Sequence, residues 1–93
     1  SNREDYRNYR DYREDYNMIT KSIREKTALS QELIDSFIEN NPNYFQVYNI
    51  IGDYMLSRKD VSTAKQYWKK ALTLEIARVE ERDEIIKKIE KYD

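Results

Sequence analysis

Residues 44–72 read YFQVYNIIGDYMLSRKDVSTAKQYWKKAL, and this stretch decides the fold. Apolar residues recur every three or four positions on both sides of the short polar link at residues 58–60, which is the spacing of one face of an α-helix. Two helices joined by so short a link must lie antiparallel. The stretch therefore predicts a helical hairpin with two apolar stripes: Tyr44, Phe45, Tyr48, Ile51, Tyr54 and Met55, then Val61, Ala64, Trp68, Ala71 and Leu72.

The ends of the hairpin helices follow from capping residues. We expect Asn41 to cap the first helix and Pro42 to be its first residue, because proline has no N–H to donate to a preceding turn. This helix runs to about Ser57. Asp60 is the expected N-cap of the second helix, which ends near Leu74.

Two further helices flank the hairpin. One is capped by Ser30 and ends at Asn40, with an apolar face of Leu33, Ile34, Phe37 and Ile38. The other covers residues 80–92 and presents Ile85, Ile86, Ile89 and Tyr92 on one side. We expect the opposite, solvent-facing side of this last helix to carry the pairs Asp83–Lys87 and Glu84–Lys88.

The N-terminal residues 3–26 predict one long charged helix. Tyr9, Tyr12, Tyr16, Ile19 and Ile23 are spaced by three and four residues, which is the seam of a heptad pattern. This stripe either lies on its own domain or serves self-association or the docking of another domain. The chain thus divides into the charged helix, residues 3–29, and a helical domain, residues 30–93. Residues 1–2 look like the scar of a cleaved tag, which implies a piece excised from a longer protein.

Composition supports an all-α fold of about five antiparallel helices and excludes several kinds of chemistry. The 93 residues include one Gly and one Pro, too few for the turns of a β-protein, and 13% aromatic residues, too many for a solvated coil. Histidine and cysteine are absent, so imidazole bases, thiolate nucleophiles and zinc sites have no raw material. We expect no catalytic, metal-binding or cofactor-binding residues.

The charge balance argues against nucleic acids and membranes as partners. The net charge is −1, and the N-terminal arginines that alternate with tyrosines are cancelled by adjacent acids within a Debye length. No apolar run approaches the length of about 18 residues that a membrane span needs. The compartment is left open.

Residues 42–75 resemble a tetratricopeptide repeat. The pattern of that family, W-x2-L-G-x2-Y followed by A-x3-F, corresponds here to Tyr48-x2-Ile51-Gly52-x2-Met55 followed by Ala64-x3-Trp68. The small Gly52 and Ala64 predict a close approach of the two helices, and the bulky Trp68 and Tyr48 fill the space beside it. The resemblance implies one repeat with capping helices on both sides. Its structural residues are Tyr48, Ile51, Gly52, Ala64, Trp68 and Ala71.

The whole chain is more loosely similar to the C-terminal tails of certain Bacteroidetes hydrolases. These are N-terminal-nucleophile enzymes of the choloylglycine hydrolase and acyl-CoA:6-aminopenicillanic acid acyltransferase type. The similarity rests on the link Leu74-Glu75-Ile76 and the basic final helix. Catalysis in that family uses an N-terminal Cys, which this chain lacks. The resemblance therefore implies a catalytic domain elsewhere in the parent protein and no catalytic residue here.

Two sets of residues are candidates for binding a partner. A repeat hairpin usually binds with the exposed side of its first helix, which would offer Gln46, Asn49 and Asp53 as a polar, mildly acidic surface for an extended peptide with basic or amide groups. The tyrosine seam of Tyr9, Tyr12 and Tyr16 is the second set. The leading hypothesis is a non-catalytic protein-interaction or accessory domain at the C-terminal end of a larger bacterial protein. Its partner is a protein, a peptide or another domain of the same chain. The alternatives are the tail of an amide hydrolase or acyltransferase, and a homodimerisation module.

Overall fold

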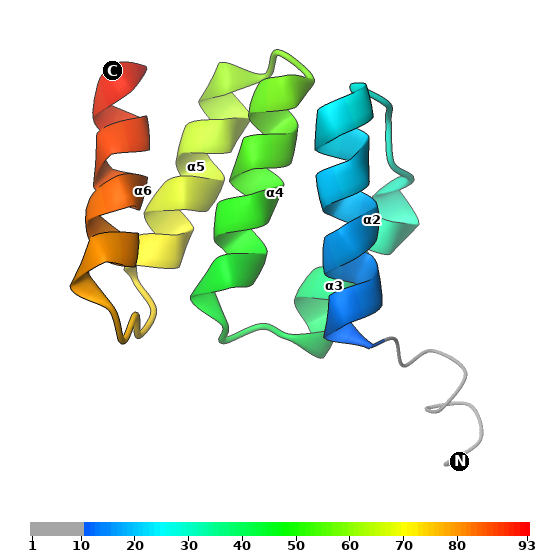
Figure 1. The fold of residues 1–93 in the computed structure, drawn as a ribbon, viewed down its shortest axis with the longest axis horizontal. Helices are drawn as coiled ribbons and strands as arrows, with labels where there is room; N and C mark the ends of the chain where they lie inside the picture. The colour runs from blue at the N-terminus through cyan, green and yellow to red at the C-terminus, as the bar shows by residue number, and fades with distance from the viewer. Residues whose placement is uncertain (1–10) are drawn as a thin grey trace.

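The computed structural model describes residues 11–93, and these are all-α. They form five helices and no strand: α2 (Tyr12–Glu25), α3 (Gln31–Asn40), α4 (Phe45–Ser57), α5 (Val61–Leu72) and α6 (Val79–Lys91). The predicted fold class is thus confirmed. Four of the five helices lie side by side in the order α6, α5, α4, α2, with α3 against α2 and α4 (Figure 1).

The hairpin of α4 and α5 is the centre of the domain. Its helices run in opposite directions and make the most extensive contact between any two helices of residues 11–93, while α2 packs on the other side of α4 and α6 on α5 (Figure 1). This position explains why α4 is apolar on most of its surface. Side chains from all five helices meet in one core, whose fully buried members include Ile19, Phe37, Val47, Ile51, Trp68 and Ile85.

Close approach of α4 and α5 occurs at Gly52, as the sequence predicts. A Cβ atom built on Gly52 would overlap Cδ1 and Nε1 of Trp68 and would lie 3.1 Å from the carbonyl oxygen of Ala64. Glycine lowers helix stability relative to alanine, so its presence in mid-helix has this steric cause. The other predicted structural residues are also buried: Tyr48, Ile51, Ala64, Trp68 and Ala71.

Two predicted helix caps are present and one is wrong. The side-chain oxygens of Ser30 and Asp60 accept hydrogen bonds from the backbone N–H groups of Leu33 and Thr63, at 3.2 and 3.1 Å. The prediction that Asn41 caps the next helix is wrong, because α4 begins only at Phe45.

The residues between α3 and α4 close the first helix instead of opening the second. Asn41 is the C-cap of α3, and its side-chain amide donates a hydrogen bond to the carbonyl oxygen of Phe37 at 3.1 Å. Pro42 therefore lies in the connecting turn, where its carbonyl oxygen accepts a hydrogen bond of 2.7 Å from the Tyr48 hydroxyl. The first turn that we assigned to α4 is thus part of the loop.

The long N-terminal helix is shorter than predicted. Asp11 has an extended backbone with ψ 127°, and its carboxylate accepts a hydrogen bond from the backbone N–H of Arg13, so it is the N-cap of α2, which begins at Tyr12. Lys26 adopts the left-handed conformation and ends the helix. One unbroken helix over residues 3–26 is therefore wrong at Asp11, and the part of that prediction on residues 3–10 lies outside the described residues.

Candidate functional site

Gln46, Asn49 and Asp53 lie on one face of α4. Their spacing of three and four residues places them on one side of a helix, and each is partly exposed. The sequence predicts this set as a partner-binding surface, and the structure adds what its members contact.

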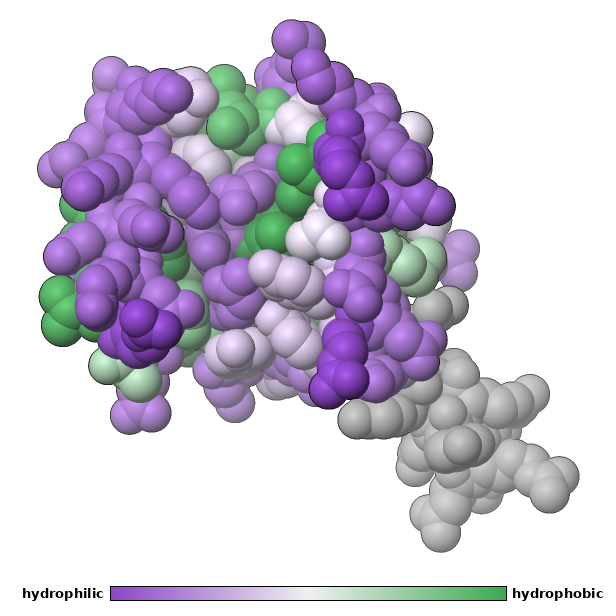
Figure 2. All heavy atoms as spheres, viewed as in Figure 1, coloured by the Kyte–Doolittle hydropathy of each residue, from purple (hydrophilic) through white to green (hydrophobic). Residues whose placement is uncertain are grey.

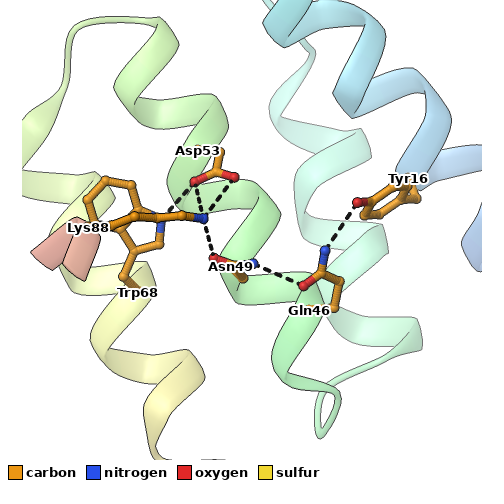
Figure 3. Close-up of polar contacts among 6 residues, drawn as sticks. All are labelled: Tyr16, Gln46, Asn49, Asp53, Trp68 and Lys88. Atoms are coloured by element: carbon orange, nitrogen blue, oxygen red, sulfur yellow. Dashed lines mark hydrogen bonds and ion pairs between the residues drawn. The ribbon is translucent and has the colours of Figure 1, made fainter. Parts of the chain in front are cut away.

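Hydrogen bonds link these three residues into a continuous line that crosses three helices (Figure 3). The Gln46 amide donates to the hydroxyl of Tyr16 on α2 at 3.1 Å, and the Asn49 amide donates to Oε1 of Gln46 at 3.0 Å. At the other end, Nζ of Lys88 on α6 donates to Oδ1 of Asn49 at 2.9 Å and to the carboxylate of Asp53 at 3.0 and 3.2 Å. We call these five residues the polar row.

Asp53 is held from two sides. The indole Nε1 of Trp68 on α5 donates to Oδ1 of Asp53 at 3.1 Å, and Trp68 itself is fully buried. The Lys88 ammonium also lies over the indole ring, 5.8 Å from its centroid, in cation–π geometry. Because Lys88 balances the charge of Asp53, the acidic character that the sequence suggests for this surface is neutralised at this position.

Lys88 is the residue of this site that sequence reasoning missed. We assigned it to the solvent-facing side of the last helix, paired with Glu84, and that assignment is wrong. A helical spacing of three residues from Ile85, which is 1% exposed, places Lys88 at the border of the buried face. The sequence contains this spacing as a signal. It does not contain a signal for the partner of Lys88 on α4.

Four aromatic residues continue the polar row beyond Tyr16, and we call them the aromatic cluster: Tyr12, Tyr16, Phe37 and Tyr44. The ring of Tyr12 lies 5.7 Å from Tyr16, 5.3 Å from Tyr44 and 5.4 Å from Phe37, measured between centroids. Tyr44 is 47% exposed and also contacts Phe45 edge-on. Burial, and secondarily the neighbouring hydroxyls of Tyr44 and Tyr16, raise the pKa of Tyr12 well above its ordinary value.

The stripe of α2 packs on its own domain. Ile19 is fully buried, and Tyr12, Tyr16 and Ile23 are partly buried against the core. Of the predicted tyrosine seam, Tyr12 and Tyr16 therefore reach the polar row and the aromatic cluster, while Tyr9 lies outside the described residues. The inward side of this stripe is not free to bind a second molecule.

The comparisons with known proteins provide no relative. No protein-family model, no curated protein and no solved structure matches this chain. Within residues 11–93, no group of three or more acidic side chains is placed to hold a metal ion, and no helix is long and apolar enough to cross a membrane.

Proposed function

We propose that this chain is a non-catalytic protein-interaction domain that binds an extended segment of a partner at the polar row. The segment belongs to another protein or to another domain of the same protein. The observation that carries the proposal is the row itself, in which partly exposed amide side chains are held in fixed orientations on the central helix. Side chains held in place by their neighbours lose less conformational entropy on binding than free ones.

The amide groups of the row have hydrogen-bonding capacity for a ligand. A side-chain amide has two N–H donors, and in the described part of the chain Gln46 and Asn49 each use one of them within the row. The second N–H of each is not used in the row and suits the backbone carbonyl of an extended chain. The Tyr16 hydroxyl accepts from Gln46, so its own hydrogen is also available.

The resemblance of residues 42–75 to a tetratricopeptide repeat supports the same surface. In that family the exposed side of the first hairpin helix usually contacts partners, and the corresponding helix here is α4. The catalytic alternative concerns a parent protein: a hydrolase tail of this kind would have no activity of its own and would dock through a surface such as this one. The homodimer alternative has less support, because the stripe of α2 is used in the core.

A random peptide library displayed on phage tests the proposal. Peptides selected on the immobilised protein are titrated into ¹⁵N-labelled protein, and we expect them to shift the side-chain amide signals of Gln46 and Asn49. The variant Gln46→Glu keeps an acceptor for the Asn49 amide and lets the Tyr16 hydroxyl donate where it now accepts. It removes both amide donors, so it should weaken binding. Glu90→Gln, an exposed change on α6, is the matched control. Selected peptides that bind with equal affinity to Gln46→Glu and shift other signals would contradict the proposal.

A further inference from the structure

The polar row has hydrogen-bond donors to offer, and each of its oxygens named below already accepts at least one hydrogen bond. Oε1 of Gln46 accepts from Asn49, Oδ1 of Asn49 accepts from Lys88, and the carboxylate of Asp53 accepts from Lys88 and Trp68. The second amide hydrogen of Gln46 and that of Asn49 make none of these bonds. A ligand that brings carbonyl oxygens therefore finds hydrogen-bond donors along this row.

The row is also electrically balanced. Its only charges are those of Asp53 and Lys88, which neutralise each other at 3.0 Å. The remaining members, Tyr16, Gln46 and Asn49, are neutral. A charged ligand would lose its hydration here without gaining an opposite charge, so this surface favours an uncharged one.

Flat apolar rings adjoin the donors. Tyr16 belongs to the row and to the aromatic cluster, so Gln46, Tyr16, Tyr12 and Tyr44 form an unbroken series of contacts. Tyr44, at 47% exposure, offers a ring to a ligand. Figure 2 shows that pale and green residues lie between α4 and α2, with strongly hydrophilic residues on both sides.

From these three properties we infer that the polar row and the aromatic cluster bind a proline-rich segment in the polyproline II conformation. The inference rests on the proposed function and names its ligand. Proline has no N–H, its backbone carbonyls project freely in this conformation, and its rings pack on aromatic side chains. The segment is already extended before it binds, so little conformational entropy is lost. Carbonyls would accept from Gln46 and Asn49 while a proline ring lies on Tyr44.

An NMR titration with synthetic peptides tests this inference. The probes are an acetylated and amidated octaproline and three octapeptides with the same blocked ends: glycine-serine, glutamate-rich and lysine-rich. We expect octaproline to produce saturable shifts of the Gln46 and Asn49 side-chain amides and of the Tyr44 ring. The three comparison peptides should bind more weakly by about tenfold or more.

Variants of Tyr44 separate stacking from folding. Serine is a favourable residue at the N-cap position that Tyr44 occupies, so Tyr44→Ser removes the ring and gives α4 a side chain suited to that position. We expect Tyr44→Ser to raise the Kd for octaproline about tenfold and Tyr44→Phe to leave it nearly unchanged. Val79→Ser, which changes a 67% exposed residue at the start of α6, is the control and should have no effect.

The outcomes distinguish this inference from the proposed function. If octaproline leaves the Gln46 and Asn49 signals unchanged while a library-selected peptide without proline shifts them, the proline inference is wrong and the binding surface stands. If a charged comparison peptide binds more tightly than octaproline at these signals, the inference is again wrong. If neither octaproline nor any selected peptide shifts them, both the inference and the proposed function fail.

Discussion

The ammonium of Lys88 on α6 lies 3.0 Å from Oδ1 of Asp53 on α4, and the same carboxylate oxygen accepts the indole N–H of Trp68 on α5. One carboxylate thus joins three helices. About 30% of each side chain of the ion pair is exposed, 31% for Lys88 and 29% for Asp53, whereas Trp68 is fully buried. The two partners of Asp53 therefore depend on it to different degrees, because only Trp68 has no access to water as a substitute.

Replacing the two members of the ion pair should have unequal effects. Asp53→Ala leaves the buried N–H of Trp68 without an acceptor and should lower the free energy of unfolding by about 2 kcal/mol. Lys88→Ala leaves that hydrogen bond intact and should cost about 1 kcal/mol. Lys87→Ala, an exposed neighbour, should change it by less than about 0.5 kcal/mol. Urea unfolding followed by circular dichroism measures all three, and equal losses for Lys88→Ala and Lys87→Ala would refute the role of the ion pair.

Gly52→Ala should destabilise the domain although alanine is the better helix former. The gain in helix propensity is about 1 kcal/mol. The added Cβ would overlap the indole of Trp68 and approach the backbone of Ala64, and such overpacking costs about 1–3 kcal/mol. We expect a net loss in the free energy of unfolding. In a Trp68→Phe background the extra cost of Gly52→Ala should become smaller, and an unchanged cost would show that the overlap is not its cause.

Local signals in the sequence were sufficient for some elements and not for others. Ser30 and Asp60 are predicted correctly because an N-cap depends on a few adjacent residues. Asn41 is predicted wrongly because an asparagine between two helices can end the first as readily as it can begin the second. The hydrogen bond from its side-chain amide to the Phe37 carbonyl shows that it ends the first.

Local sequence signals also predict only part of the candidate site. Gln46, Asn49 and Asp53 are found by helical periodicity alone. The partner of Asp53 lies 35 residues away along the chain, so the pair with Lys88 depends on how α6 packs and not on any local pattern. The exposure of Tyr44 likewise follows from the late start of α4, because this residue precedes the helix that we expected to contain it.

Truncation of the buried stripe of α2 should destabilise the domain. Ile19 is fully buried, and Ile19→Ala should lower the free energy of unfolding by about 2–4 kcal/mol. Asn17→Ala, on the exposed side of the same helix, should cost less than about 0.5 kcal/mol. Thermal unfolding of both variants checks this difference. If Ile19→Ala retained full stability, α2 would not be part of the core.

Stability should fall in alkaline solution because of Tyr12. Burial raises the pKa of its hydroxyl above the ordinary value of 10.0, so the unfolded chain loses this proton first. The contribution of Tyr12 to the free energy of unfolding is complete below the pKa of about 10 in the unfolded chain. It is lost as the pH rises toward the pKa of Tyr12 in the folded protein. Tyr12→Phe should therefore flatten the decline of stability above about pH 10. Urea midpoints measured across this range test it, and an equally steep decline in Tyr12→Phe would exclude Tyr12 as its source.

Asp93 should titrate below its ordinary pKa because Lys65 holds its ionised form. A hydrogen bond from the Lys65 ammonium is the main cause that lowers the pKa of this exposed carboxyl below 3.8, and the charge of Lys69 adds to it. The stabilising contribution of Asp93 is thus present above the pKa that its carboxyl has in the unfolded chain. It disappears as the pH falls through the pKa of Asp93 in the folded protein. The ¹³C shift of the Asp93 carboxyl followed during acid titration measures the value directly. Lys65→Met should return the pKa of Asp93 to the ordinary range, while Lys87→Met should not change it. A titration midpoint of Asp93 that Lys65→Met leaves unchanged would mean that the two side chains do not pair in solution.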